Sequence, residues 1–335
     1  MRRRRVLGCV GAAVPVCFSA ACGGGGGGGS SVSSSMLWVG ATASQSVAWL
    51  AAEGGYFKQN GVDMQLSFQS GSPTAAASLA GGHVDFVQMA GPAVVTADAK
   101  GAQLVMVMGI VTKPTFVLMT GSDIQTPDQL KGKSLGVVQV GSSDDFMLRA
   151  GLERWGLQPD RDVKIVPLQS IQGQIAGFQK HLVQGLVVDP PNDLLAGRAG
   201  AHLLARIADL GIPYQAAGLV TTQSFLRDHR GTVTKATQAM IQAIHRFKTD
   251  RQFAQQVMGR YLKTNDAATL KDAYDEFSPT FPQVPLPSQA GLEEIVRLDV
   301  QAGTIKTPVS ASSLADPSIV SDLQKNGFIQ RVYGA

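Results

Sequence analysis

The chain has 335 residues, of which 44% are hydrophobic and 16% charged, and its formal net charge is +4. Four of its 29 basic residues, Arg2–Arg5, precede residue 22 and no acidic residue does, so the remainder carries 25 charges of each sign. This balance lacks the basic excess that nucleic-acid binding requires. All three cysteines, Cys9, Cys17 and Cys22, lie at the same end. The rest of the chain therefore has no disulfide, thiolate metal site or cysteine nucleophile.

Residues 1–21 have the order of an export signal. The arginines precede an apolar stretch, Val6–Phe18, and small residues follow at 19–21. The apolar stretch is too short to span a bilayer as a permanent helix. Arg3–Leu7 also fits a loose twin-arginine pattern, so the sequence leaves the export route open.

Cys22 is a candidate lipidation site. Small residues precede it, as the processing site of a bacterial lipoprotein requires, although Ser19 stands where a larger aliphatic residue is usual. Residues 22–35 are rich in Gly and Ser, which predicts a flexible tether. The alternative is simple cleavage after Ala21. We expect a lipid anchor at Cys22, because a tether directly after a cysteine has an obvious use.

From Met36 onward, strands alternate with helices. The elements expected in the first part are strands at 37–40, 62–69, 84–89 and 103–110, and helices at 46–59, 72–80 and 92–100. This alternation predicts parallel βαβ units.

The pattern restarts near Thr126. Here we expect strands at 134–139, 163–167, 186–189 and 218–222, and helices at 126–130, 143–155 and 172–181. A mostly helical part follows, in which helix 234–249 has one apolar face at helical spacing, as a core-packing helix does.

One supersecondary unit is echoed within the chain. The two copies are Leu79-x-x-Gly82-x-Val84-Asp85 and Phe178-x-x-His181-x-Val183-Gln184. Such repetition suggests two similarly wound lobes. His181 and Gln184 replace Gly and Asp in the second copy, so we transfer no role to that junction.

Several short motifs carry a family resemblance. They are Gln45-Ser46-Val47-Ala48, Glu53-Gly54-Gly55-Tyr56-Phe57, Asn60-Gly61-Val62, Ser70-Gly71-Ser72-Pro73, Leu130-Lys131-Gly132-Lys133, Gly141-Ser142-Ser143 and Gly156-Leu157-x-Pro159. In this order they resemble the solute-binding proteins of ABC importers for nitrate, taurine, aliphatic sulfonates and pyrimidine precursors of thiamine.

The resemblance implies a type II periplasmic-binding-protein fold, an α/β fold of two lobes joined by two crossing hinge strands. We assign 36–118 with 218–335 to the first lobe and 119–217 to the second. It further implies a binding protein that delivers a small molecule to an ABC permease with its ATPase. With the export signal, we expect it in the periplasm or cell envelope, and we expect a monomer because the capture protein closes by a hinge.

The ligand is expected where loops follow the carboxyl ends of strands. Four loops fall there, at 42–46, 70–74, 89–92 and 141–143. The candidate ligand-binding residues in and beside these loops, and after the strand at 186–189, are Gln45, Ser46, Trp49, Gly71, Ser72, Thr74, Met89, Gly91, Ser142, Ser143 and Asp189.

The loop at 70–74 is the best defined of the four. Ser72 can cap a helix and Pro73 suits its first turn, so free amides near Thr74 would bind an anionic or carbonyl oxygen. Plain helix capping is the alternative.

Asp144 and Asp145 follow the fourth loop and leave two interpretations. They face solvent as ordinary first-turn acids, which we favour, or one of them contacts a ligand amine.

An enzyme is not expected. The five histidines are scattered without metal-ligand spacing, and no nucleophile elbow or phosphate-binding loop occurs. We therefore expect no cofactor, no metal and a small sulfonate, oxyanion or pyrimidine-like ligand. The alternatives are a tethered sensor that presents the same cleft to a receptor and, less favoured, an enzyme of pyrimidine-precursor metabolism.

Overall fold

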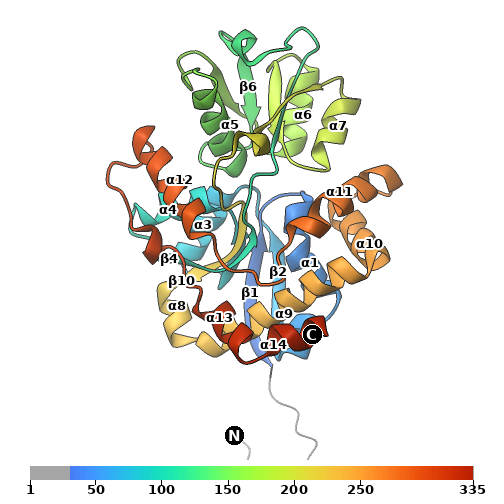
Figure 1. Cartoon of the computed structure of the whole chain (residues 1–335), viewed down its shortest axis with the longest axis vertical. Helices are drawn as coiled ribbons and strands as arrows, with labels where there is room; N and C mark the ends of the chain where they lie inside the picture. Colours follow the sequence, from blue (N-terminus) through green and yellow to red (C-terminus); the bar gives the residue numbers. More distant parts are fainter. Residues whose placement is uncertain (1–30, 335) are drawn as a thin grey trace, which may run out of the picture. The chain divides into compact units, whose positions relative to one another are not determined.

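The computed structural model describes residues 31–334, which contain two five-stranded sheets flanked by helices (Figure 1). The first sheet has the order β2 (Val62–Phe68), β1 (Val32–Trp38), β3 (Phe86–Met89), β10 (Ala217–Thr222), β4 (Leu104–Val111). The second has the order β7 (Lys164–Pro167), β6 (Ser134–Val137), β8 (Gly185–Val188), β5 (Val117–Thr120), β9 (His202–Arg206). We call each sheet with its helices a lobe.

Both sheets follow the same plan. β1 pairs in parallel with β2 and β3, and β6 pairs in parallel with β7 and β8. One antiparallel strand is then inserted into each sheet, β10 between β3 and β4, and β5 between β8 and β9. The chain crosses between the sheets after β4 and again before β10, which confirms the predicted two-lobed α/β class.

The crossings differ slightly from the predicted lobe boundaries. Residues 117 and 118, assigned by sequence to the first lobe, belong to β5 of the second sheet. Ala217, assigned to the second lobe, begins β10 of the first. Pairing with distant strands fixes these positions, and local sequence carries no signal for it.

Helices cover both sheets. In chain order they are α1 (Ser46–Glu53), α2 (Tyr56–Gln59), α3 (Ser72–Ala80), α4 (Gly91–Asp98), α5 (Ser143–Arg154), α6 (Ile171–Gln179), α7 (Asn192–Arg198), α8 (Gln223–Asp228), α9 (Arg230–Thr249), α10 (Arg251–Leu262), α11 (Ala267–Thr280), α12 (Gln289–Gln301), α13 (Ser318–Lys325) and α14 (Phe328–Tyr333). Helices α5 to α7 pack on the second sheet, and the chain after β10 returns to the first lobe (Figure 1).

The start of the fold corrects the predicted tether. Residues 32–35 are not tether but the first part of β1, paired in parallel with β2. Asp85 explains why serines are accepted there, because its Oδ2 accepts hydrogen bonds from Ser34 Oγ at 2.7 Å and from the Ser35 backbone N–H at 2.8 Å. The export signal at 1–21 and Cys22 lie outside the described residues.

Helix α9 packs in the core, as its apolar face predicts. Ala236, Met240, Ile244 and Phe247 are fully buried on it. The single helix expected at 46–59 is instead broken into α1 and α2, because Gly55 adopts a φ of 70° that interrupts helical geometry. None of the helices between residues 31 and 334 combines the length and apolar character that crossing a bilayer demands.

The echoed junctions have matching structures. Gly82 and His181 both adopt a positive φ, 71° and 57° respectively. The Gln184 side-chain oxygen accepts the Ser134 backbone N–H at 3.0 Å, just as Asp85 accepts that of Ser35. The replacements in the second copy therefore keep the local structure of the first.

Candidate functional site

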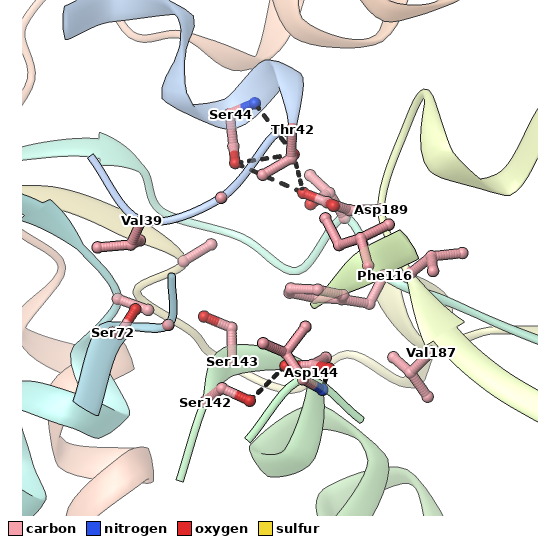
Figure 2. Close-up of a pocket in the computed structure, with 18 of the residues that line it drawn as sticks. Val39, Thr42, Ser44, Ser72, Phe116, Ser142, Ser143, Asp144, Val187 and Asp189 are labelled. Atoms are coloured by element: carbon pink, nitrogen blue, oxygen red, sulfur yellow. Dashed lines mark hydrogen bonds between the residues drawn. The ribbon is translucent and has the colours of Figure 1, made fainter. Parts of the chain in front are cut away.

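A cavity of about 650 Å³, counted out to its open mouth, is lined by residues of both lobes (Figure 2). The first lobe contributes the loop after β1 and the start of α3. The second lobe contributes the start of α5, part of α6 and the end of β8, and the segments that cross between the lobes supply Thr115, Phe116 and Ala216. The carboxyl ends of parallel strands thus meet at one place, where ligands bind in open α/β sheets.

The start of α3 forms part of the first-lobe wall. Gly71 precedes this helix with a φ of 81°, and no side chain caps the helix end. A Cβ at position 71 would be strained at this φ and would overlap the side-chain amide of Gln139 in the second lobe, which would have to move. The uncapped first-turn amides beside Ser72 can donate hydrogen bonds to a ligand acceptor.

Asp144 contributes a buried carboxyl group from the first turn of α5. Its Oδ2 accepts hydrogen bonds from the Val138 backbone N–H at 2.6 Å and from Gln174 Nε2 at 2.8 Å, and Ser142 Oγ donates to its Oδ1. Burial raises the pKa of Asp144 to about 6, although the hydrogen bond from Ser142 opposes the shift.

The favoured interpretation of the two acids of this turn was wrong. Asp144 and Asp145 are only 6% and 2% exposed, so neither faces solvent. Asp145 accepts the Gly141 backbone N–H at 2.7 Å and pairs with Arg149 at 2.8 Å. Both carboxylates hold the loop before α5 in place, and Asp144 also lines the cavity.

Asp189 follows β8 and contacts the first lobe. Its Oδ2 accepts hydrogen bonds from Thr42 Oγ1 at 2.5 Å and from Ser44 Oγ at 3.4 Å (Figure 2). Burial raises the pKa of Asp189 to about 7, the Thr42 hydrogen bond lowers it, and the nearby charge of Asp144 raises it further. This carboxyl group is therefore both a link between the lobes and a polar group of the cavity.

The remaining lining is largely apolar. Phe116 places its ring between the two carboxyl groups in the view of Figure 2, and Val39, Val138 and Val187 also line the cavity. No Lys, Arg or His is part of the lining within residues 31–334, and Lys113, a possible cation after β4, lies outside it.

Six of the predicted ligand-binding residues come together here: Gln45, Gly71, Ser72, Ser142, Ser143 and Asp189 all line the cavity. The hydroxyl groups of Ser72 and Ser143, from different lobes, both lie beside it (Figure 2). Gln45 is oriented by its Oε1, which accepts the Val39 backbone N–H at 3.2 Å.

The other five do not line the cavity. Ser46 donates to the Ala43 carbonyl, and Trp49 is fully buried and stacks on Tyr261 with ring centroids 4.9 Å apart. Met89 lies in the core, and the Gly91 N–H donates to the Gln215 carbonyl at 2.9 Å. Thr74 is exposed, with its hydroxyl 3.4 Å from Gln139 Oε1. Helix rotation and strand alternation turn these side chains away.

Sequence reasoning missed several lining residues. Thr42 and Ser44 lie in a predicted loop but were not singled out. Gln174 lies in the first part of α6, a helix that follows the parallel strand β7. A polar side chain early in such a helix was the signal that could have found it. Thr115 lies on a crossing segment and carries no local signal. Among the described residues, no group of three or more His, Cys, Asp or Glu side chains could hold a metal ion.

Comparison with known proteins places the chain in a family. Residues 45–251, more than half of the chain, match the family described as NMT1/THI5 like. The chain belongs to this family. Among curated proteins, the NMT1/THI5-like chain is 23% identical over 247 residues to the "Putative binding protein YtlA" of Bacillus subtilis (strain 168), which covers 70% of the chain and 68% of that protein.

Solved structures share the fold of this NMT1/THI5-like protein. The alkanesulfonate-binding protein SsuA from Xanthomonas axonopodis pv. citri, bound to MOPS, is similar with a TM-score of 0.74 at 19% identity, covering 86% of this chain and 99% of that one. The periplasmic nitrate-binding protein NrtA from Synechocystis PCC 6803 gives 0.75 at 11% identity, with 88% and 89% covered. The predicted type II periplasmic-binding-protein fold is confirmed.

Proposed function

We propose that this protein is the substrate-binding protein of an ABC-type importer, which captures a small solute between its lobes and delivers it to a membrane permease. The observation that carries the proposal is the cavity, to which both lobes contribute side chains and which Asp189 and Thr42 bridge. Such a site forms only when the lobes meet, as capture by hinge closure requires.

The names of similar proteins support the same function. SsuA and NrtA carry alkanesulfonate and nitrate in their names, and YtlA is named a binding protein. We propose export to the periplasm or cell envelope, anchoring through a lipid on Cys22, and a monomer as the working unit. A permease and its ATPase are the proposed partners.

Binding without turnover tests this function. A solute held well above its Kd raises the free energy of unfolding by about 2.7 kcal/mol at 100 times Kd. Thermal-shift screening of sulfonates, nitrate, pyrimidines and small amines is expected to give a clear stabilisation by one class. The released solute is expected to be chemically unchanged, as mass spectrometry would show. Conversion of the solute would contradict a capture protein.

A variant of Ser72 locates the site. Ser72→Phe places an aromatic ring at the cavity wall and is expected to abolish binding with little change in melting temperature, because Ser72 lines the cavity and the ring would take up the space of the ligand. Ser78→Phe is the matched control on the same helix, since its hydroxyl only donates to the Thr74 carbonyl. Equal loss of binding in both variants would remove the start of α3 from the site.

A further inference from the structure

The charge of the cavity lining is one-sided. Asp144 and Asp189 are 6% and 5% exposed, and no basic side chain lines the cavity within residues 31–334. The adjacent Asp145 is paired with Arg149, so the charge of that arginine compensates Asp145 and not the carboxyl groups of the cavity. Burying a carboxylate without a compensating cation is unfavourable. The cavity therefore holds two buried acids that no basic side chain between residues 31 and 334 compensates.

Gln174 adds an independent observation. This side chain is fully buried and lines the cavity, and its Oε1 has no hydrogen-bond partner in the part of the chain that the structure describes. The orientation of the amide is fixed, because its Nε2 donates to Asp144 Oδ2 at 2.8 Å and to the Gly136 carbonyl at 3.2 Å, both of which are acceptors. The unpartnered atom is thus a true acceptor, and only a donor can satisfy it.

Asp189 offers a second free acceptor. Its Oδ2 accepts hydrogen bonds from Thr42 and Ser44, whereas its Oδ1 accepts none from another residue between 31 and 334. At Asp189 and Gln174, the side-chain hydrogen-bonding capacity that remains unmet is therefore that of acceptors.

The helix ends do not reverse this balance. At the start of α5, the carboxylates of Asp144 and Asp145 already accept the backbone N–H groups of Val138 and Gly141. Two carboxylates there repel a further anion. Neither α3 nor α5 has a side-chain cap, and the start of α3, whose first turn carries no acid, can bind an acceptor at the other end of the same ligand.

We propose that the captured solute carries a positively charged nitrogen with at least two N–H groups, an ammonium or amidinium, which binds between Asp144, Asp189 and Gln174. This inference rests on the proposed capture function and names its ligand class. Phe116 and the valines contact the apolar body of the solute, and an acceptor group on that body reaches the start of α3. A simple sulfonate or nitrate has no N–H donor for these three side chains.

Matched ligand pairs test the proposal. Taurine carries a cationic nitrogen that isethionate lacks, and benzamidine carries one that benzenesulfonate lacks. Nitrate is included as the smallest oxyanion. Calorimetric titration of the purified protein is expected to show binding of taurine or benzamidine. No binding is expected of isethionate, benzenesulfonate or nitrate, which carry no cationic nitrogen. Asp144→Asn and Asp189→Asn, which keep side-chain shape, are each expected to weaken that binding by about tenfold or more.

Asp299→Asn is the matched control. Asp299 is also a buried acid, 6% exposed with a raised pKa, but it lies on α12 outside the cavity. Its replacement is expected to leave the affinity unchanged. Binding of isethionate, benzenesulfonate or nitrate that survives both cavity substitutions would overturn the ligand class while supporting capture. Binding of no compound at all would contradict capture itself.

Discussion

At the residue scale, burial changes the chemistry of Asp189 and Asp144 most. Thr42 and Ser44 donate hydroxyl hydrogen bonds to Asp189, and two amides and the Ser142 hydroxyl donate to Asp144. All these donors are neutral, and no cation between residues 31 and 334 contacts either carboxyl group. Neutral hydrogen bonds only partly replace water around a carboxylate. Both pKa values are consequently raised, to about 7 and about 6.

These shifts predict how stability depends on pH without ligand. The pKa of an unfolded Asp is about 3.9, so between about pH 4 and pH 7 the folded protein binds more protons than the unfolded chain. The free energy of unfolding is expected to fall as the pH rises through this window, and Asp299, with its pKa raised to about 7, adds to the fall. Chemical denaturation at pH 5 and pH 8 measures it.

Asp189→Asn is the control for that measurement. The variant lacks the titrating group, so its stability is expected to change less between the two pH values. If the free energy of unfolding of the wild-type protein rises from pH 5 to pH 8, the raised pKa values of Asp144 and Asp189 would be contradicted. Asp266, whose pKa is lowered to about 2 by hydrogen bonds from Thr269 and Arg198, acts only below this window.

The site residues were predictable only as far as loop positions allow. Parallel strands carry their following loops to one edge, which is how Ser72, Ser143 and Asp189 could be found from sequence. The rotation of a side chain within a helix is set by packing partners far along the chain. Trp49 shows the limit, since its ring stacks on Tyr261 in the core and not in the cavity.

At the element scale, the start of α3 is both a helix end and a contact between lobes. Ser70 Oγ donates to the Gln169 carbonyl at 2.9 Å, and Gly71 approaches Gln139, both residues of the second lobe. The helix itself, at 72–80, was predicted to the residue because Ser-Pro marks its first turn. Its role between the lobes carries no local signal.

Gly71→Ala is expected to weaken ligand binding by about tenfold, which is 1.4 kcal/mol. Two effects combine: a residue with a Cβ is strained at a φ of 81°, and that Cβ overlaps Gln139 when the lobes meet. Gly82→Ala is the control, because Gly82 has a φ of 71° and open space around it. Titration of both variants gives the comparison, and equal affinities would contradict a role of Gly71 in closure.

Strands β5 and β9 show that secondary structure predicted from sequence lacked the information on long-range strand pairing. Both were missed, because β5 is a four-residue apolar run and β9 lies at a sheet edge with Leu203 51% exposed. Pairing of β5 with β8 and β9 makes them strands. The echoed motif was more informative, since His181 and Gln184 take the backbone and hydrogen-bonding roles of Gly82 and Asp85.

At the scale of the whole molecule, polar contacts join the lobes around the cavity. Besides the Thr42–Asp189 bond, Asn192 Nδ2 donates to the Ala41 carbonyl at 3.3 Å and Arg198 pairs with Asp266 at 2.5 Å. The last pair is exposed to solvent, which screens it, so its contribution to stability is small. Contacts this weak can break and reform, as entry and release of a solute require.

The central claim is that the cavity holds one small solute and does not transform it. Native mass spectrometry of the purified protein, incubated with the matched cationic and anionic compounds, tests this directly. The account predicts a complex of one protein with one amine or amidine, from which the same compound is recovered on unfolding. Recovery of an altered compound, or no complex with any compound, would contradict this claim, whereas a complex formed only with the anions would contradict the proposed ligand class alone.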